Sequence, residues 1–435
     1  VFAGLVLAEA THPAYLPGAA QANLVYAHTS SRLFTMDPFD YEIQKDPYPV
    51  YKDLREHAPI YHVPEYDMWV LSRYEDIQTV IRDWQTFSNR EGVDIDKTDS
   101  LLSPGHMDEK DGAEHDKYRR LVQRWFGPKQ LQQNIVEPLR TETAALVAAF
   151  RERGGGDVVE DISWQLPAFV VTRMFDAPDG SRPELVNYMK PVFERLPNDP
   201  VPPQAAFDSG EHITNWCRDL IRKRRREGFS HRGDILSGLM SSELDGKPLD
   251  DQQLLGIISH LIVASSGTTQ DLISNAVWLL GTHPEERTKL INSPDNIPAA
   301  IEECLRYEAV IQSATRVTNR EVEFYGVTVP AGATVVNLLG SANRDERKWD
   351  NPDRFDISRR PEGILSDASG GYGGHLSFAD GIHMCLGRPI ARFEANFVIE
   401  EFMKQMPNYK IAAPPIRAVS HVARGFERVL IEAGD

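Results

Sequence analysis

One stretch decides how the rest of the chain is interpreted: His375-Leu-Ser-Phe378-Ala-Asp-Gly381-Ile-His383-Met-Cys385-Leu-Gly387. It places Cys385 between two glycines, just before a segment, Arg388–Gln405, whose pattern predicts a helix. Backbone N–H groups of a tight turn can donate hydrogen bonds to the sulfur and stabilise the thiolate, the form that ligates a metal. A buried free cysteine is the commoner fate of this residue type. The glycines, the phenylalanine and two histidines at fixed offsets favour a ligand instead.

Charge and cysteine content narrow the classes of protein. The 435 residues include 47 Lys and Arg against 64 Asp and Glu, which gives a net charge of −17. A nucleic-acid partner requires a basic face, so we expect none. The three cysteines, Cys217, Cys304 and Cys385, are too far apart for a disulfide framework or for paired zinc-ligand spacing. They suit a reducing cytoplasm. The apolar run Val1–Ala8 is too short for a membrane anchor.

The chain is expected to be mainly α with a small β portion. Residues 1–36 show no clear periodicity and are interpreted as an N-terminal extension, followed by a single domain over residues 37–435. Helices are predicted at Tyr48–His57, Tyr74–Arg82, His115–Trp125, Ile135–Arg151, several places in 183–227, Asp251–Leu280, Pro284–Leu290, Ile297–Glu308 and Arg388–Gln405. Strands are predicted at Met68–Ser72, Ala314–Val317, Val322–Phe324, Thr334–Leu339 and Val429–Ile431.

The segment Asp251–Leu280 predicts a long central helix of about 45 Å at 1.5 Å per residue. Its middle, Ala264-Ser-Ser-Gly-Thr-Thr269, consists largely of poor helix formers. Ser and Thr side chains can bond back to preceding carbonyls, and glycine lets the helical ladder open, so a local kink or groove is expected. A close helix crossing is the alternative explanation.

Several charged residues occur at spacings or in surroundings that suggest a binding partner. Glu303 and Arg306 lie three apart on one predicted helix, and His115 and Arg119 lie four apart on another, so each pair shares a face. Such pairs are usually weak surface pairs. Arg316 lies in a strand-like piece among apolar and small residues, where an unpaired guanidinium would be costly. A dianionic ligand would offset that cost.

Together these motifs resemble the cytochrome P450 family of haem-thiolate monooxygenases, in its soluble bacterial form. The cysteine loop of that family, F-G-x-G-x-[HR]-x-C-x-G, is matched from Phe378 to Gly387, except that Ala379 replaces the first glycine. The family's E-x-x-R helix is matched by Glu303-Cys-Leu-Arg306, and the segment Asn351-Pro-Asp-Arg354-Phe-Asp356 resembles the one that follows it. The resemblance covers about residues 37–435 and implies the cytochrome P450 fold.

The resemblance implies a haem b cofactor whose iron is ligated by the Cys385 thiolate. Phe378 and Gly387 belong to the same loop. The haem propionates would be bound by His115, Arg119, Arg316 and His375, with His383 as a further candidate. Glu303, Arg306 and Arg354 would form a buried ion network that holds the cysteine loop and has no catalytic role.

The oxygen-activating groove departs from the family pattern [AG]-G-x-[DE]-T-[TS]. Thr268 keeps the hydroxyl of that pattern, but Gly267 stands where the family has an acid and Ser265 where it has glycine. Ser266, Ser265, Gln270, Asp271, an ordered water or a polar group of the substrate could complete the proton relay. If the missing acid is the only fault, Gly267→Asp or Gly267→Glu should raise the coupling of oxygen use to product formation.

Three readings follow from this departure. The first is a monooxygenase that inserts one oxygen atom of O₂ into a hydrophobic small molecule, by hydroxylation or O-dealkylation. The second is a peroxide-using or nitric-oxide-reductase-like haem-thiolate enzyme, which needs no such relay. The third is a haem sensor or ligand carrier without turnover. Retention of Thr268 favours the first reading, and Gly267 supports the second.

The resemblance also implies the substrate pocket and the electron donor. The pocket should be mostly apolar, with walls from Val263, Ala264, Gly267, Ile311, Gln312, Ala314, the region Gly92–Gly105 and Gly425-Phe426. Electrons would come from a separate ferredoxin-type or flavodoxin-type protein. It would dock behind Cys385 on a positive surface formed by Arg388, Arg392, Lys117 and Arg124.

Overall fold

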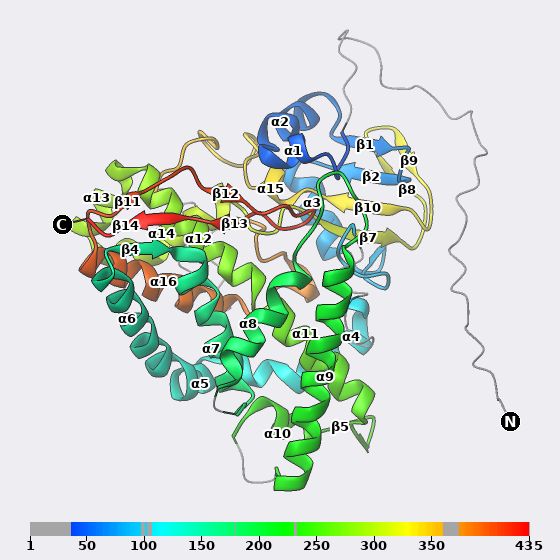
Figure 1. Cartoon of the computed structure of the whole chain (residues 1–435). Helices are drawn as coiled ribbons and strands as arrows, with labels where there is room; N and C mark the ends of the chain where they lie inside the picture. The colour runs from blue at the N-terminus through cyan, green and yellow to red at the C-terminus, as the bar shows by residue number, and fades with distance from the viewer. Residues whose placement is uncertain are drawn as a thin grey trace, which may run out of the picture. The chain divides into compact units, whose positions relative to one another are not determined.

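The structure is a computed structural model that describes residues 36–96, 101, 107–178, 180–229, 233–359 and 374–434. Of the expected extension, residues 1–35 lie outside the described residues. Residues 36–435 form one compact unit. The element order confirms a mainly helical fold with small sheets (Figure 1).

The described helices begin at Tyr41 and end at Gln405. They are α1 (Tyr41–Lys45), α2 (Tyr48–His57), α3 (Tyr74–Arg82), α4 (Gly112–Val122), α5 (Pro128–Leu131), α6 (Glu137–Glu152), α7 (Gln165–Met174), α8 (Ser181–Val192), α9 (Gln204–Glu227), α10 (Ile235–Met240), α11 (Asp251–Ala264), α12 (Gly267–Thr282), α13 (Pro284–Asn292), α14 (Ile297–Tyr307), α15 (Leu339–Ala342) and α16 (Arg388–Gln405). The predictions at Tyr48–His57, Tyr74–Arg82 and Arg388–Gln405 are confirmed to the residue. Helix α7 was not predicted, because its apolar residues face neighbours on several sides and leave little periodicity.

Five strands form the main sheet, in the order β1 (Ile60–Val63), β2 (Met68–Leu71), β10 (Thr334–Asn337), β7 (Ala314–Thr318) and β3 (Phe87–Ser88). Strand β10 pairs in parallel with β2 and antiparallel with β7, so segments from both ends of the chain meet in this sheet. Figure 1 shows it beside α2 and α3, away from the large group of helices. The ladder places Arg316 opposite Val335.

The remaining strands form small sheets of two or three strands. Strands β4 (Gly155–Asp157), β14 (Leu430–Glu432) and β11 (Lys410–Ile411) form a three-stranded sheet. Three hairpins pair β12 (Ile416–Arg417) with β13 (Phe426–Arg428), β5 (Glu243–Leu244) with β6 (Lys247–Pro248), and β8 (Val322–Phe324) with β9 (Val327–Val329). The loop between β12 and β13 later contributes to the site.

The predicted long helix is interrupted at its middle. Helix α11 begins at a capping box, in which Asp250 and Gln253 each bond the backbone of the other, and ends at Ala264. Helix α12 begins at Gly267, and the two intervening serines form a turn. Both serine hydroxyls bond back to the carbonyl of Ile262, which supports the predicted opening of the helical ladder.

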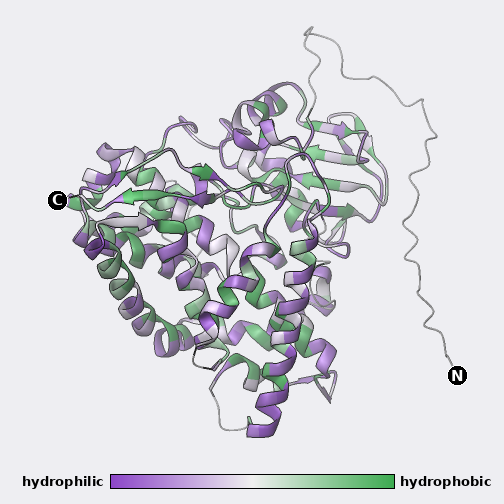
Figure 2. Cartoon of the chain, in the orientation of Figure 1, coloured by the Kyte–Doolittle hydropathy of each residue, from purple (hydrophilic) through white to green (hydrophobic). Residues whose placement is uncertain are grey.

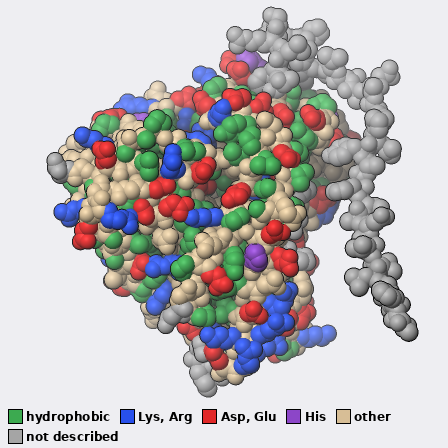
Figure 3. Space-filling view, viewed as in Figure 1, with side chains coloured by type: hydrophobic (Ala, Val, Ile, Leu, Met, Phe, Trp, Pro, Cys, Tyr) green, Lys and Arg blue, Asp and Glu red, His purple; other side chains and the backbone are tan. Residues whose placement is uncertain are grey.

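Helix α9 ends in the basic segment Arg222-Lys-Arg-Arg-Arg226, where cations interact favourably with the C-terminal end of the helix dipole. Its lower end is hydrophilic in Figure 2 and carries a group of Lys and Arg side chains in Figure 3. Arg222, Arg225 and Arg226 are exposed. Arg224 is buried and binds Asp234 at 2.5 Å, so it joins α9 to the start of α10. No described helix is long and apolar enough to cross a membrane.

Candidate active site

The cysteine loop is held by its own backbone and by α3. The Cys385 N–H donates to the Phe378 carbonyl at 2.9 Å, and the Arg388 guanidinium donates to the Cys385 carbonyl at 2.9 Å. Asp380 accepts from Arg82 at 2.7 Å and from the Gly381 N–H at 2.7 Å. Gly381 has a φ of 68°, and a Cβ there would lie 3.0 Å from the Ile81 carbonyl oxygen. Glycine is therefore required at this turn.

Two effects act on the Cys385 thiol. Burial raises its pKa, while N–H bonds from Gly387 and Arg388 oppose that rise. These two N–H groups point at the sulfur from the start of α16, where the helix dipole also favours negative charge. The loop therefore presents a sulfur whose charged form is supported by the backbone but disfavoured by burial. A cation bound at the sulfur would resolve that conflict.

Ala379 occupies a backbone conformation that suits glycine. Its φ is 54°, in the left-handed region, where a Cβ costs about 1–2 kcal/mol. This is the position at which the cysteine-loop pattern has glycine. The substitution thus leaves local strain in the loop that carries Cys385.

Ala379→Gly should therefore raise the stability of the holoprotein by about 0.5–1 kcal/mol after the entropy cost of glycine is subtracted. The measurement is the apparent thermal midpoint. The control is Ala145→Gly on the exposed face of α6, where the same change should lower stability by a similar amount. A lower midpoint for both variants would show that Ala379 is not strained.

A cavity of about 350 Å³ lies against the cysteine loop. It joins α7, the end of α8, the α11–α12 junction, β7 and the loop between β12 and β13. The expected site residues that line it are Val263, Ala264, Thr268, Arg119, Ile311, Ala314, Arg316, Phe378, His383, Cys385 and Gly387. Those outside its lining are Ser266, Gly267, His115, His375, Gln312 and Phe426.

One end of this cavity is cationic. Arg316 is 2% exposed, and burial lowers its pKa to about 10. Arg119 donates to the Met384 carbonyl at 2.7 Å. The rings of His115 and His383 lie 4.4 Å apart, and His115 is buried directly behind His383. Within the described residues, His115 Nε2 and His383 Nδ1 have no hydrogen-bond partner. Buried cations and orphaned ring nitrogens together fit a ligand with carboxylates.

His375 is the exception among the proposed propionate ligands. Its Nε2 lies 2.9 Å from Glu302, whose other oxygen binds Arg392 at 2.7 Å. Both partners hold the pKa of Glu302 below its ordinary value against the effect of burial. His375 therefore belongs to a buried ion network and does not line the cavity. His383 lines the cavity, where His375 was expected. Arg392 is buried in the same network, so it cannot belong to a docking surface.

The network that supports the cysteine loop contains a different arginine from the one predicted. Arg306 binds Glu303 through two bonds of 2.8 Å and donates to the carbonyls of Asn343 and Pro352. The second guanidinium on Glu303 comes from Arg359, at 3.1 Å. Arg354 contributes only its carbonyl to these bonds, and its side chain is exposed. The predicted role of Arg354 was wrong, because the chain turns between the two residues and points Arg359 inward.

The α11–α12 junction places its three predicted residues differently. The Thr268 hydroxyl faces the cavity and donates to the Ala264 carbonyl at 2.9 Å. Ser266 is buried behind the junction, and its hydroxyl contacts the Met189 sulfur at 2.6 Å. It does not reach the cavity.

An aromatic side chain packs against Gly267 and leaves no room for a larger residue at this position. A Cβ at this position would lie 2.7 Å from the ring of Phe193, a residue that lines the cavity. Phe193 therefore fills the space that a carboxylate at position 267 would need. Gly267→Asp would displace the ring as well as add an acid, so it cannot test the proton relay alone. A double variant with Phe193→Ala separates the two effects.

Gln312 and Phe426 belong to other surroundings than the predicted pocket wall. Phe426 packs against Trp278, with ring centroids 5.1 Å apart, and beneath the Arg417 guanidinium. Gln312 donates to the Ala309 carbonyl and lines a smaller, separate cavity. The cavity wall comes instead from Ser420, Val422 and Ala423.

The cavity lining also contains charged residues that were not predicted, among them Arg195 and Glu394. Arg195 binds Asp96 at 2.6 Å, with side chains 3% and 1% exposed. Glu394 on α16 is buried, and burial raises its pKa well above the ordinary value. The pair spans 99 residues of sequence, and Glu394 lies in an ordinary helical pattern. No local signal in the sequence distinguishes either.

The fold and this site define a class of haem-binding proteins with a cysteine ligand. The profile of the cytochrome P450 family matches residues 38–406, and the chain belongs to that family. Cytochrome P450 109 of Bacillus spizizenii is 32% identical over 364 residues, covering 82% of this chain and 84% of its own. Erythromycin C-12 hydroxylase of Saccharopolyspora erythraea is 32% identical over 380 residues, covering 87% and 90%.

Solved structures agree with the sequence relatives. P450BioI in complex with an acyl carrier protein ligated to hexadec-9Z-enoic acid superposes with a TM-score of 0.78. The two chains are 27% identical, and the match covers 90% of this chain and 99% of the other. The chain is therefore a cytochrome P450 monooxygenase with a haem-iron cofactor, acting on a small molecule and O₂. The residues that line the cavity fit that cofactor: Cys385 could hold the iron, and Arg119, Arg316 and His383 could bind its carboxylates, with His115 packed behind His383.

Proposed function

We propose that this chain inserts one oxygen atom of O₂ into a largely apolar small molecule, by hydroxylation or O-dealkylation: RH + O₂ + 2e⁻ + 2H⁺ → ROH + H₂O. The observation that best supports this proposal is a single cavity, lined by Thr268, by apolar residues of α11 and by the Cys385 loop. The cofactor is proposed to be haem b, which supplies the activation of O₂ when bound. The three free cysteines suit a cytoplasmic location.

The protein's own residues would orient substrate and hold protons. Val263, Ala264 and Phe193 supply apolar contact beside Thr268. Without an acid at position 267, two described carboxyl groups whose pKa is raised by burial are Glu394 on the cavity wall and Asp271 on α12. Burial raises the pKa of Asp271 to about 8, but the residue lies outside the cavity lining. Glu394 is therefore the better-placed proton store.

Electrons are proposed to come from a separate ferredoxin-type or flavodoxin-type protein. Of the residues proposed for the positive docking surface, Arg124 is exposed, Lys117 and Arg388 are half-buried, and Arg388 also bonds the Cys385 carbonyl. Lys117 already pairs with Asp245 at 2.7 Å, which weakens its contribution. One relative is named erythromycin C-12 hydroxylase, and one similar structure holds an acyl carrier protein ligated to hexadec-9Z-enoic acid, so erythromycin-type and fatty-acid-derived compounds both belong in a substrate screen.

The test is a comparison of oxidants on the holoprotein. Candidate substrates are selected by the absorption change that accompanies ligand binding near the iron, and product is then measured with a ferredoxin system plus O₂ or with hydrogen peroxide. Monooxygenase function predicts faster product formation with the ferredoxin system. Turnover with peroxide alone would favour the peroxygenase alternative, which Gly267 supports. Binding without product under either condition would favour a sensor or carrier.

A further inference from the structure

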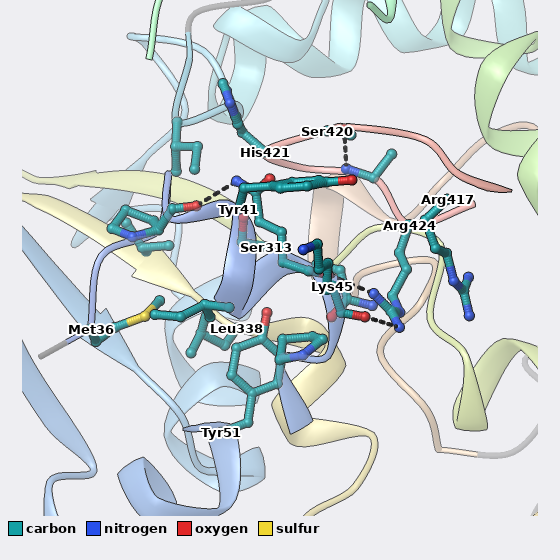
Figure 4. A pocket seen from close by; sticks show the side chains of 18 of the residues that line it. Met36, Tyr41, Lys45, Tyr51, Ser313, Leu338, Arg417, Ser420, His421 and Arg424 are labelled. Carbon is teal, nitrogen blue, oxygen red and sulfur yellow. Dashed lines mark hydrogen bonds between the residues drawn. The ribbon is translucent and has the colours of Figure 1, made fainter. Parts of the chain in front are cut away.

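A second, smaller cavity lies behind the wall of the large one. Its volume is about 40 Å³, and it shares Ser313, Ser420 and Ala423 with the 350 Å³ cavity. Figure 4 shows its surroundings, where α1, the residue before β7 and the loop between β12 and β13 meet. We call it the side pocket.

The side pocket concentrates polar atoms that lack partners. Gln312, Ser313 and His421 are 7%, 4% and 5% exposed, and all three line it. Within the described residues, Gln312 Oε1, Ser313 Oγ and His421 Nε2 have no hydrogen-bond partner. Gln44 Oε1, from α1, is a fourth buried orphan in the same lining. Each such atom costs about 1–3 kcal/mol when left unsatisfied, so four around one space indicate an occupant.

The unpartnered polar atoms show which hydrogen bonds a group bound in the side pocket must make. The amide nitrogens of Gln44 and Gln312 already donate to the carbonyls of Pro38 and Ala309. Their free oxygens are therefore acceptors, which require a donor from the occupant. Ser313 can donate or accept, and one ring nitrogen of a neutral His421 accepts while the other donates. The occupant must both donate and accept.

Two charged groups fail this requirement, because an ammonium group only donates and a carboxylate only accepts hydrogen bonds. Arg417 and Arg424 both bind Glu308 at 2.7 Å, and Arg344 lies 3.7 Å from the same carboxylate. Arg344 also lies 3.5 Å from Asp353, and His421 Nδ1 lies 3.3 Å from Asp96, so local charge by itself does not select the occupant. A carboxylate is disfavoured by the two glutamine oxygens, which would face it without a proton between them. A neutral hydroxyl satisfies both conditions.

We propose that the side pocket binds a hydroxyl group of the substrate, whose apolar body lies in the large cavity. This inference rests on the proposed function and narrows its substrate class to apolar alcohols. Ser313, Ser420 and Ala423 line both cavities, so only one layer of side chains divides them, and the proposal requires the Ser313 and Ser420 side chains to rotate aside for the hydroxyl. The volume admits one such group, or up to about three waters if no ligand enters.

The test uses two isomers on the holoprotein. Decan-1-ol and methyl nonyl ether have the same atoms, but the ether cannot donate a hydrogen bond. We expect decan-1-ol to bind about tenfold more tightly, measured by calorimetry and by the absorption change on ligand binding. Decanoic acid should bind more weakly than the alcohol. Equal affinity for the isomers, or tighter binding of the acid, would overturn the proposal and leave a pocket that holds water only.

Ser313→Ala provides the matched variant. It removes an orphaned hydroxyl, so the thermal midpoint should not fall, while the preference for decan-1-ol over the ether should shrink severalfold. The control is Ser163→Ala, because Ser163 is equally buried and has an unpartnered hydroxyl, but lines neither cavity. An unchanged preference in Ser313→Ala would overturn the proposal. Because binding is measured without turnover, loss of monooxygenase activity leaves this result interpretable.

Discussion

Cys385→Ala should abolish monooxygenase activity and the absorption band that marks thiolate ligation in the reduced, carbon-monoxide-bound protein. The physical reason is the loss of the sulfur that the backbone of α16 supports at the cavity floor. Alanine has no sulfur, so the variant also lacks the thiolate ligand that donates electron density to the haem iron. Spectra of the reduced protein with carbon monoxide provide the measurement. A thiolate band that persists in the variant would contradict the assignment of Cys385.

Cys217→Ala is the matched control for that experiment. Cys217 is fully buried in α9, and burial raises the pKa of its thiol well above the ordinary value. It therefore behaves as a small apolar side chain. We expect the control to retain the thiolate band and turnover, with at most a modest loss of stability.

Glu303→Gln should destabilise the protein by about 3–5 kcal/mol and impair haem retention. The carboxylate binds both Arg306 and Arg359, and its side chain is 3% exposed. Glutamine keeps the shape but leaves two guanidiniums without a buried counter-charge. Since whole domains are stable by about 5–15 kcal/mol, this is a large fraction of the total. Thermal unfolding together with the ratio of haem to protein provides the measurement.

The control for this prediction is Glu42→Gln in α1. Glu42 pairs with Lys45 on the surface, where the two side chains are 77% and 47% exposed. Exposed pairs contribute at most about 1 kcal/mol, so the control should change the thermal midpoint little. If Glu303→Gln were as mild as this control, the buried network would not support the cysteine loop as described.

The corrections share a physical cause. Arg354 and Arg359 lie five residues apart in one segment, and only the path of the backbone decides which guanidinium reaches Glu303. His375 and His383 flank the same loop, but Glu302, from α14, captures the first. Gly267 suggests a missing acid in the sequence, whereas the structure shows a ring from α8's end in that space. In each case the partner comes from a distant segment.

The sequence by itself determined the helical class and placed Glu303 and Arg306 on one helical face, because periodicity and fixed spacing act over a few residues. Its resemblance to the cytochrome P450 family implied Cys385 as the iron ligand and Arg119 and Arg316 as propionate partners. The tertiary structure alone decided that Arg359 completes the ion network, that Phe193 packs on Gly267, and that Gln312, Ser313 and His421 surround one pocket. Those contacts join segments far apart in the chain, and only packing fixes which side chains meet there.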